Sequence, residues 1–101
     1  MSGVIEAVKH VSKDLGINED VIILEGIGEF IKSRIKACMR DRLEILSRYK
    51  TSSIEDFENK VTDGRIPEHP GWEDLIIIEN LENSIAKLKK ELLDVRNISI
   101  S

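Results

Sequence analysis

Apolar residues recur along this chain at intervals of three and four, which is the spacing of one helical face. Four segments show the pattern, near residues 4–15, 19–49, 53–63 and 72–95. The run VIIL at 21–24 has the composition of a strand, but its capping signals and the pattern that follows favour a helix. We therefore predict an all-α fold of four helices, two of them long, as one domain over residues 1–101. Residues 96–101 are expected to form a frayed tail.

Local signals mark the boundaries between these segments. Gly16 supplies the left-handed residue that ends a helix, and Asn18 is a good N-cap for the next one. Ser52 and Glu55 have the spacing of a capping box, and the pair at 63–64, Asp-Gly, predicts the end of the third helix. The second segment contains two internal glycines at 26 and 28, which we attribute to close approach of another helix or to a bend.

Both prolines of the chain fall in IPEHPGWED at residues 66–74. Because a proline disfavours helical geometry in the residue before it, Pro67 and Pro70 predict a hinge that precedes the fourth helix. Trp72 is interpreted as an anchor that inserts into the core at the start of this helix. His69 has no second histidine at metal-ligand spacing, which favours a structural role over a metal-binding or catalytic one.

The fourth segment carries an unbroken seam of branched aliphatic residues at alternating intervals of three and four. Such a seam is typical of coiled-coil packing, either with the second helix of the same chain or with another chain. Residues 75–77 are also apolar and surround the first turn of the helix, which one neighbouring helix cannot cover. We therefore predict a helical hairpin or bundle completed by dimerisation, and we assign the seam to the oligomer interface: Ile78, Leu81, Ile85, Leu88, Leu92 and Val95.

The net charge of −4 is mild, but the charges alternate in blocks. Residues 32–50 carry 7 basic and 2 acidic side chains, whereas residues 51–82 carry 2 basic and 9 acidic ones. Lys32, Lys36 and Arg40 repeat at intervals of four and share one helical face, so they are candidate phosphate-binding residues. No exposed aromatic residue is expected beside them. The alternative is that this basic face meets the acidic block, within one chain or between chains.

The sequence offers little that predicts catalysis. The single Cys38 has no adjacent base and cannot form an intramolecular disulfide, which favours a reducing, cytoplasmic setting. We predict no catalytic residues, no metal site and no cofactor. No apolar segment approaches the roughly 20 residues of a membrane span, and residues 1–20 do not resemble a signal peptide. An enzyme would need polar groups to converge from separate helices.

Two stretches resemble known small proteins. VIEAVKHVSKDLGINEDVIILEGIGEFIKSRI at 4–35 resembles the helix pair of ribbon-helix-helix proteins, and YKTSSIEDFENKVTDGRIPEHPGWEDLIIIENLE at 49–82 resembles the C-terminal part of small prokaryotic antitoxin-like proteins. Only Met1-Ser2-Gly3 precedes the first helix, so the strand with which ribbon-helix-helix proteins read DNA is missing. The resemblance implies a small dimeric protein that binds a protein partner.

These observations predict a non-catalytic helical interaction protein that forms a homodimer and binds a protein partner, in the manner of an antitoxin. The alternative function is a nucleic-acid-binding regulator that uses the basic face of the second helix, and it is the less favoured of the two.

Overall fold

The computed structural model describes residues 2–100, which form four helices: α1 (Ser2–Leu15), α2 (Glu19–Arg48), α3 (Ile54–Thr62) and α4 (Glu68–Ile100). None of these residues lies in a strand, so the predicted all-α fold is confirmed. Within the same range, no helix is long and apolar enough to span a membrane.

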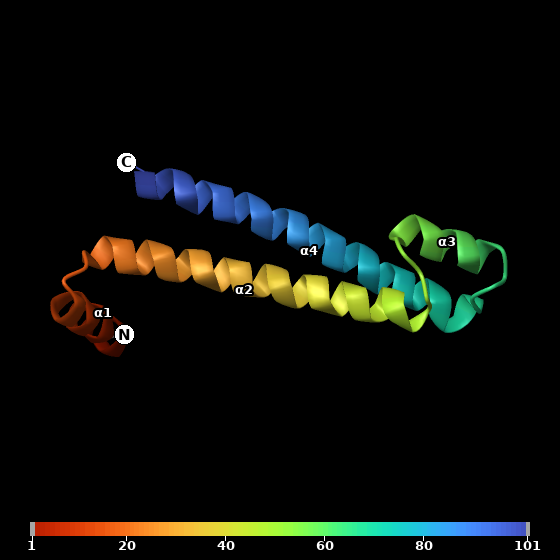
Figure 1. Cartoon of the computed structure of the whole chain (residues 1–101), viewed down its shortest axis with the longest axis horizontal. Helices are drawn as coiled ribbons and strands as arrows, with labels where there is room; N and C mark the ends of the chain where they lie inside the picture. Colours follow the sequence, from red (N-terminus) through yellow and green to blue (C-terminus); the bar gives the residue numbers. More distant parts are fainter. Residues whose placement is uncertain (1, 101) are drawn as a thin grey trace.

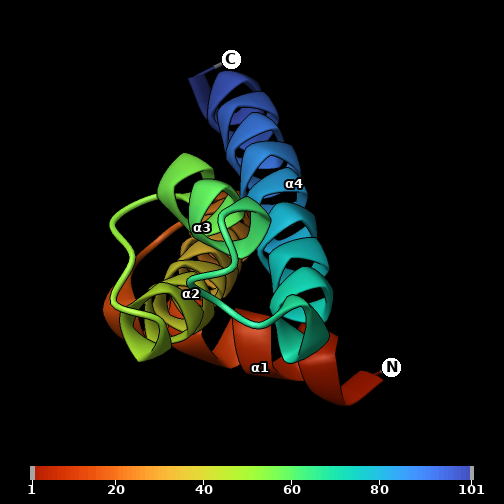
Figure 2. The ribbon, with the colours of Figure 1, turned by 90° about the vertical axis from the view of Figure 1, so that its right-hand side faces the viewer.

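The molecule is a long antiparallel hairpin of α2 and α4, with a short helix at each end (Figure 1). α3 packs where the chain turns from α2 into α4 (Figure 2), while α1 lies at the opposite end, on the other side of α2 from the C-terminal end of α4. The principal extents are 61 × 26 × 20 Å. The Cα radius of gyration is 19.7 Å, whereas a compact chain of this length has about 13 Å.

Capping residues set most of the helix ends. Gly16 has φ +67° and ends α1, and the side chain of Asn18 accepts the N–H of Asp20 at 2.8 Å at the start of α2. The cap of α3 differs from the prediction by one residue. The Ser53 side chain, not that of Ser52, accepts the N–H of Asp56 at 3.0 Å. The Asp56 carboxylate in turn accepts the N–H of Ser52.

The predicted hinge is present at the start of α4. His69 has φ −118° and ψ 122°, so regular helix begins only after it. The other end of α4 differs from the prediction. The helix continues through residues 96–100, which we expected to be frayed, and Ser101 lies outside the described residues. The last turns are helical because the intrahelical hydrogen bonds continue without a proline or glycine to stop them.

The seam of α4 packs on α2 of the same chain, in two adjacent clusters. At the α3 end, Ile78 joins a core that includes Ile45, Leu46 and Phe57. Further along, Ile85 packs with Ile31 and Ile35. The remaining seam residues are partly buried against these clusters: Leu81, Leu88, Leu92 and Val95. The seam therefore packs on α2 of the same chain, while Leu92 and Val95 also line an open groove, and the assignment of the seam to an oligomer interface stays a prediction.

Trp72 is not the buried anchor that the sequence predicted. Its side chain is 37% exposed, whereas Leu75 and Ile78 on the next turn are 4% and 0% exposed. Pro67 and Pro70 are exposed in the hinge, whereas Ile66, which directly precedes Pro67, is 5% exposed. Aliphatic residues on both sides of the hinge therefore provide the anchoring contacts, because the inward face of α4 begins at Gly71 and continues through Leu75 and Ile78.

The first test of this packing compares two isoleucines on α4. Ile78 is fully buried and Ile76 is 56% exposed. We expect Ile78→Ala to lower the free energy of unfolding by about 2–5 kcal/mol, because it removes core contacts and leaves a cavity. Ile76→Ala should change it by less than about 0.5 kcal/mol. Urea unfolding followed by circular dichroism measures both, and equal losses would contradict the burial described above.

The glycines give a second test, because their surroundings differ. A Cβ atom at Gly26 would have open space around it, whereas one at Gly71 would lie 3.2 Å from methyl groups of Ile66 and Val61. We expect Gly26→Ala to raise the free energy of unfolding by about 0.5–1 kcal/mol, since alanine is the better helix former. Gly71→Ala should lower it by about 1 kcal/mol through overpacking. Thermal unfolding midpoints that shift in the same direction for both variants would refute this.

Candidate functional site

Burial is distributed unevenly along the molecule. Among the side chains that the structure describes, every fully buried hydrophobic one lies between Ile31 and Ile85. Residues 3–30 and 86–98, which together we term the open end, contain none. Instead the open end exposes large apolar side chains to solvent: Val4, Ile5, Val11, Leu15, Ile17, Val21, Ile23, Ile27, Phe30, Leu93 and Ile98. Exposed apolar side chains that gather into a patch are characteristic of interaction sites.

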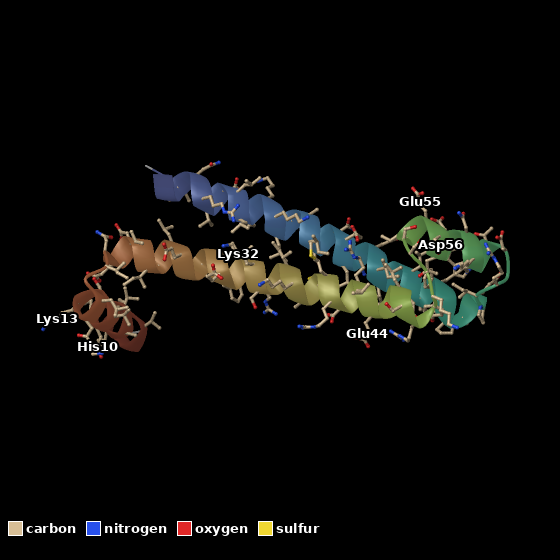
Figure 3. All side chains as sticks on the ribbon, in the orientation of Figure 1. His10, Lys13, Lys32, Glu44, Glu55 and Asp56 are labelled. Carbon is tan, nitrogen blue, oxygen red and sulfur yellow. The ribbon has the colours of Figure 1, made fainter. Side chains whose placement is uncertain are left out.

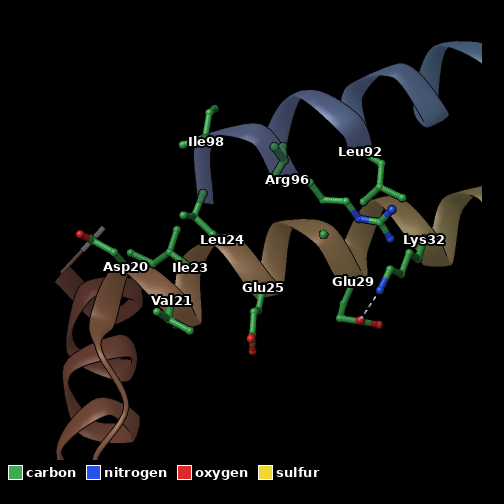
Figure 4. A pocket seen from close by; sticks show the side chains of 12 residues that line it. Asp20, Val21, Ile23, Leu24, Glu25, Glu29, Lys32, Leu92, Arg96 and Ile98 are labelled. Carbon is green, nitrogen blue, oxygen red and sulfur yellow. Dashed lines mark hydrogen bonds and ion pairs between the residues drawn. The ribbon is translucent and has the colours of Figure 1, made fainter. Parts of the chain in front are cut away.

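A groove runs between α2 and α4 at the open end (Figure 4). Its volume is about 1020 Å³, and its apolar lining comes from both helices, including Leu24, Leu92 and Val95. Ile23 and Leu24 extend toward α4, whereas Glu25 and Glu29 extend away from it. Gly28 lines the groove without a side chain, and a Cβ atom at this position would lie 3.9 Å from a Leu92 methyl group. Of the two internal glycines, only Gly28 therefore faces another helix.

Helix α1 presents a second apolar surface at the same end. Val4, Val8, Val11 and Leu15 follow one another at intervals of four, three and four, which places them on one face. Val8 is half-buried, but Val4 and Leu15 are 64% and 65% exposed. We term these four residues the α1 stripe. A hydrophobic stripe that remains exposed in a monomer indicates a helix whose packing partner is missing.

The predicted phosphate-binding residues lie on α2. Lys32 forms an ion pair with Glu29 at 3.2 Å, while Lys36 and Arg40 are exposed. One exposed aromatic residue does lie on the same helix as these three side chains. Phe30 is 59% exposed, and the Arg34 guanidinium lies 5.3 Å from the centre of its ring. Phe30 and Arg34 lie on a different face of α2 from the three candidate residues, because helical spacing rotates them away.

The basic and acidic blocks meet within the chain. Arg42 of α2 forms an ion pair with Glu82 of α4, and both side chains are about one third exposed. Near the turn, the Tyr49 hydroxyl donates a hydrogen bond to the Asp74 carboxylate, which raises the pKa of Tyr49. The Tyr49 ring also packs edge-on against Phe57, with ring centres 4.8 Å apart. These contacts stabilise the end of the hairpin where α3 packs, which we term the closed end.

The titratable groups are spread over the length of the molecule. Figure 3 places His10 and Lys13 on α1 at one end, and Glu55 and Asp56 on α3 at the other. Over the described residues, no group of three or more His, Cys, Asp or Glu side chains is arranged to hold a metal ion. Cys38 is half-buried in the middle of the hairpin, where it packs against the cluster around Ile35.

His69 has one polar contact, with the Glu73 carboxylate. Its Nδ1 lies 2.7 Å from Glu73 Oε1, one turn further along α4, and both side chains are more than half exposed. This hydrogen bond is the main cause of the lowered pKa of Glu73. The pair stabilises the first turn of the helix locally, and nothing else in the hinge converges on it to form a reactive centre.

This pair yields a prediction about pH. His69→Ala should return the pKa of Glu73 toward its usual value, because the hydrogen bond that favours the carboxylate is lost. A depressed carboxyl pKa contributes stability above the unfolded pKa that is lost as pH falls through the folded pKa, so the variant should lose a little stability near neutral pH and none in strong acid. NMR titration of Glu73 checks this. An unchanged Glu73 pKa would contradict the assigned cause.

Comparison with known proteins places the chain in a family. The model of the uncharacterized protein MJ0235 family matches residues 1–100. No curated protein and no solved structure matches the chain. The family match covers both long helices and the two short ones that flank them. The chain belongs to the uncharacterized protein MJ0235 family.

Proposed function

We propose that this protein is a non-catalytic helical interaction protein that forms a homodimer through its open end. The proposal rests on the solvent-accessible surface area of the chain. The chain exposes 7463 Å², whereas a compact monomer of 11.5 kDa exposes about 5800 Å². The excess of about 1,700 Å² exceeds the roughly 800 Å² that each partner buries in an interface of standard size.

The composition of the exposed surface supports the same conclusion. Of the fifteen large hydrophobic side chains that are exposed among the described residues, eleven lie at the open end, and the other four are Leu43, Trp72, Ile76 and Ile77. Removing apolar surface from water stabilises an assembly by roughly 25 cal/mol per Å² before the costs of association are subtracted. A second copy is always available at the concentration of the first, and symmetric dimers are the commonest assemblies of soluble proteins.

A protein partner other than a second copy is a further candidate occupant of the open end. It is the partner that the resemblance to antitoxin-like proteins implies. Nucleic acid is the less favoured alternative, for which the supporting observation is the exposure of Lys36 and Arg40. Neither of these side chains forms an ion pair within residues 2–100. Lys32 is already paired with Glu29, however, and Arg42 with Glu82, which leaves little of the basic block for phosphates.

Sedimentation equilibrium tests the proposal with two isoleucines of matched exposure. Ile23 at the open end is 45% exposed and Ile77 near the hinge is 46% exposed. We expect a wild-type dimer at micromolar concentration. Ile23→Asp should weaken the dimer at least about tenfold, equivalent to about 1.4 kcal/mol, whereas Ile77→Asp should leave its dissociation constant unchanged.

The fold of both variants is checked by circular dichroism, because each position is exposed and the charge should be tolerated in the monomer. A wild-type chain that remains monomeric at high concentration overturns the proposal. A dimer weakened by Ile77→Asp and not by Ile23→Asp would place the interface at the hinge instead. A salt-dependent complex with DNA that Lys36→Glu abolishes would favour the alternative function.

A further inference from the structure

We propose that α1 of each copy lies in the groove of the other copy, so that the α1 stripe and the groove cover each other. This inference rests on the homodimer proposed above and goes further, because it assigns the residues that meet. Both surfaces lie at the same end of the hairpin: a groove of about 1020 Å³ whose lining includes Leu24, Leu92 and Val95, and a helix with exposed Val4 and Leu15.

The dimensions of the two surfaces match. α1 has 14 residues, which is about 21 Å of helix. The groove is lined along α2 from Asp20 to Lys32, which is about 18 Å. An amphipathic helix in a hydrophobic groove contributes anchors at intervals of three and four, and the α1 stripe has this spacing over its whole length. One α1 helix therefore spans the groove from end to end.

The α1 helix of the same chain is held away from this groove by its own turn. The N–H groups of Gly16 and Ile17 donate to the Ser12 carbonyl at 2.9 and 3.2 Å, and the Ser12 hydroxyl donates to the Ile17 carbonyl. Asn18 then caps α2. With these hydrogen bonds in place α1 packs beside the start of α2, and none of its residues is among those that line the groove. Closing α1 onto its own groove would break this capped turn.

A two-fold arrangement satisfies both surfaces in one step. In a symmetric dimer, a contact from one copy to the other is repeated in reverse. The α1 stripe and the groove lie at the same end of the hairpin. When α1 of one copy enters the groove of the second copy, the two-fold axis therefore places α1 of the second copy in the groove of the first. The open end of each copy then gains a third helix, as α3 already provides at the other end of the hairpin (Figures 1 and 2).

Intermolecular paramagnetic relaxation tests the assignment without assuming a register. One sample carries Cys38→Ala and Lys13→Cys, with a nitroxide on the new cysteine on the face of α1 opposite the stripe, and no isotope label. The second sample carries Cys38→Ala with labelled methyl groups and no nitroxide. After mixing, we expect broadening of the Leu24, Leu92 and Val95 methyl signals and none of Ile76 or Ile77, which lie toward the hinge. Moving the nitroxide to Ile76→Cys should abolish the broadening at the groove.

The outcomes separate this inference from the homodimer itself. If sedimentation shows a dimer but the groove signals stay sharp, α1 is not the occupant and the inference fails while self-association stands. A monomer in sedimentation overturns both proposals.

A pair of α1 variants gives an independent readout. Val11 belongs to the stripe, and Lys13 lies on the opposite face of the helix. Val11→Asp should weaken the dimer at least tenfold, whereas Lys13→Asp, which changes the charge by more, should alter the dissociation constant less than twofold. Both keep the hairpin core intact, because α1 contributes no fully buried side chain. Equal effects of the two variants would overturn the assignment.

Discussion

The packing of the α4 seam on α2 is the interaction on which the rest of this structure depends. Ile78 and Ile85 of α4 meet Ile45, Leu46, Ile31 and Ile35 of α2 in two adjacent clusters, and no polar side chain is buried between them. Two helices that bury one stripe each can form a long hairpin, but they cannot surround each other. Every remaining apolar face must find a third element or stay in contact with water.

The two ends of the hairpin meet this requirement differently. At the closed end, α3 inserts Phe57 and Val61 against both long helices, and the most deeply buried side chains of the chain lie there. At the open end, α1 turns away from the groove after a well-capped turn, so that Leu24 and Leu92 remain partly covered. The same architecture thus has a buried core at one end and an exposed apolar surface at the other. This asymmetry is why the open end is the candidate site.

Electrostatics follow the packing and do not direct it. The Arg42–Glu82 ion pair shows the basic block of α2 and the acidic block meeting across the hairpin, which takes up part of the charge alternation within one chain. Exposed pairs such as His69 with Glu73 or Lys90 with Asp94 stabilise single helical turns and contribute little to the fold. Over the described residues, the titratable side chains are spread along the surface, and no three of His, Cys, Asp and Glu are arranged to hold a metal ion.

The sequence by itself determined the four helices and most of their ends, because capping residues such as Asn18 and Gly16 act locally and the apolar spacing is set by the helical repeat. It also revealed the α4 seam. It could not say which surface covers that seam, and it misplaced Trp72, because burial depends on the direction in which α4 leaves the hinge at His69. The open groove at Leu24 and Leu92 was also beyond it, since the same apolar spacing describes a covered and an uncovered face. Only the tertiary structure, by pairing α4 with α2 and turning α1 aside, decided which apolar residues form the core and which stay exposed to solvent.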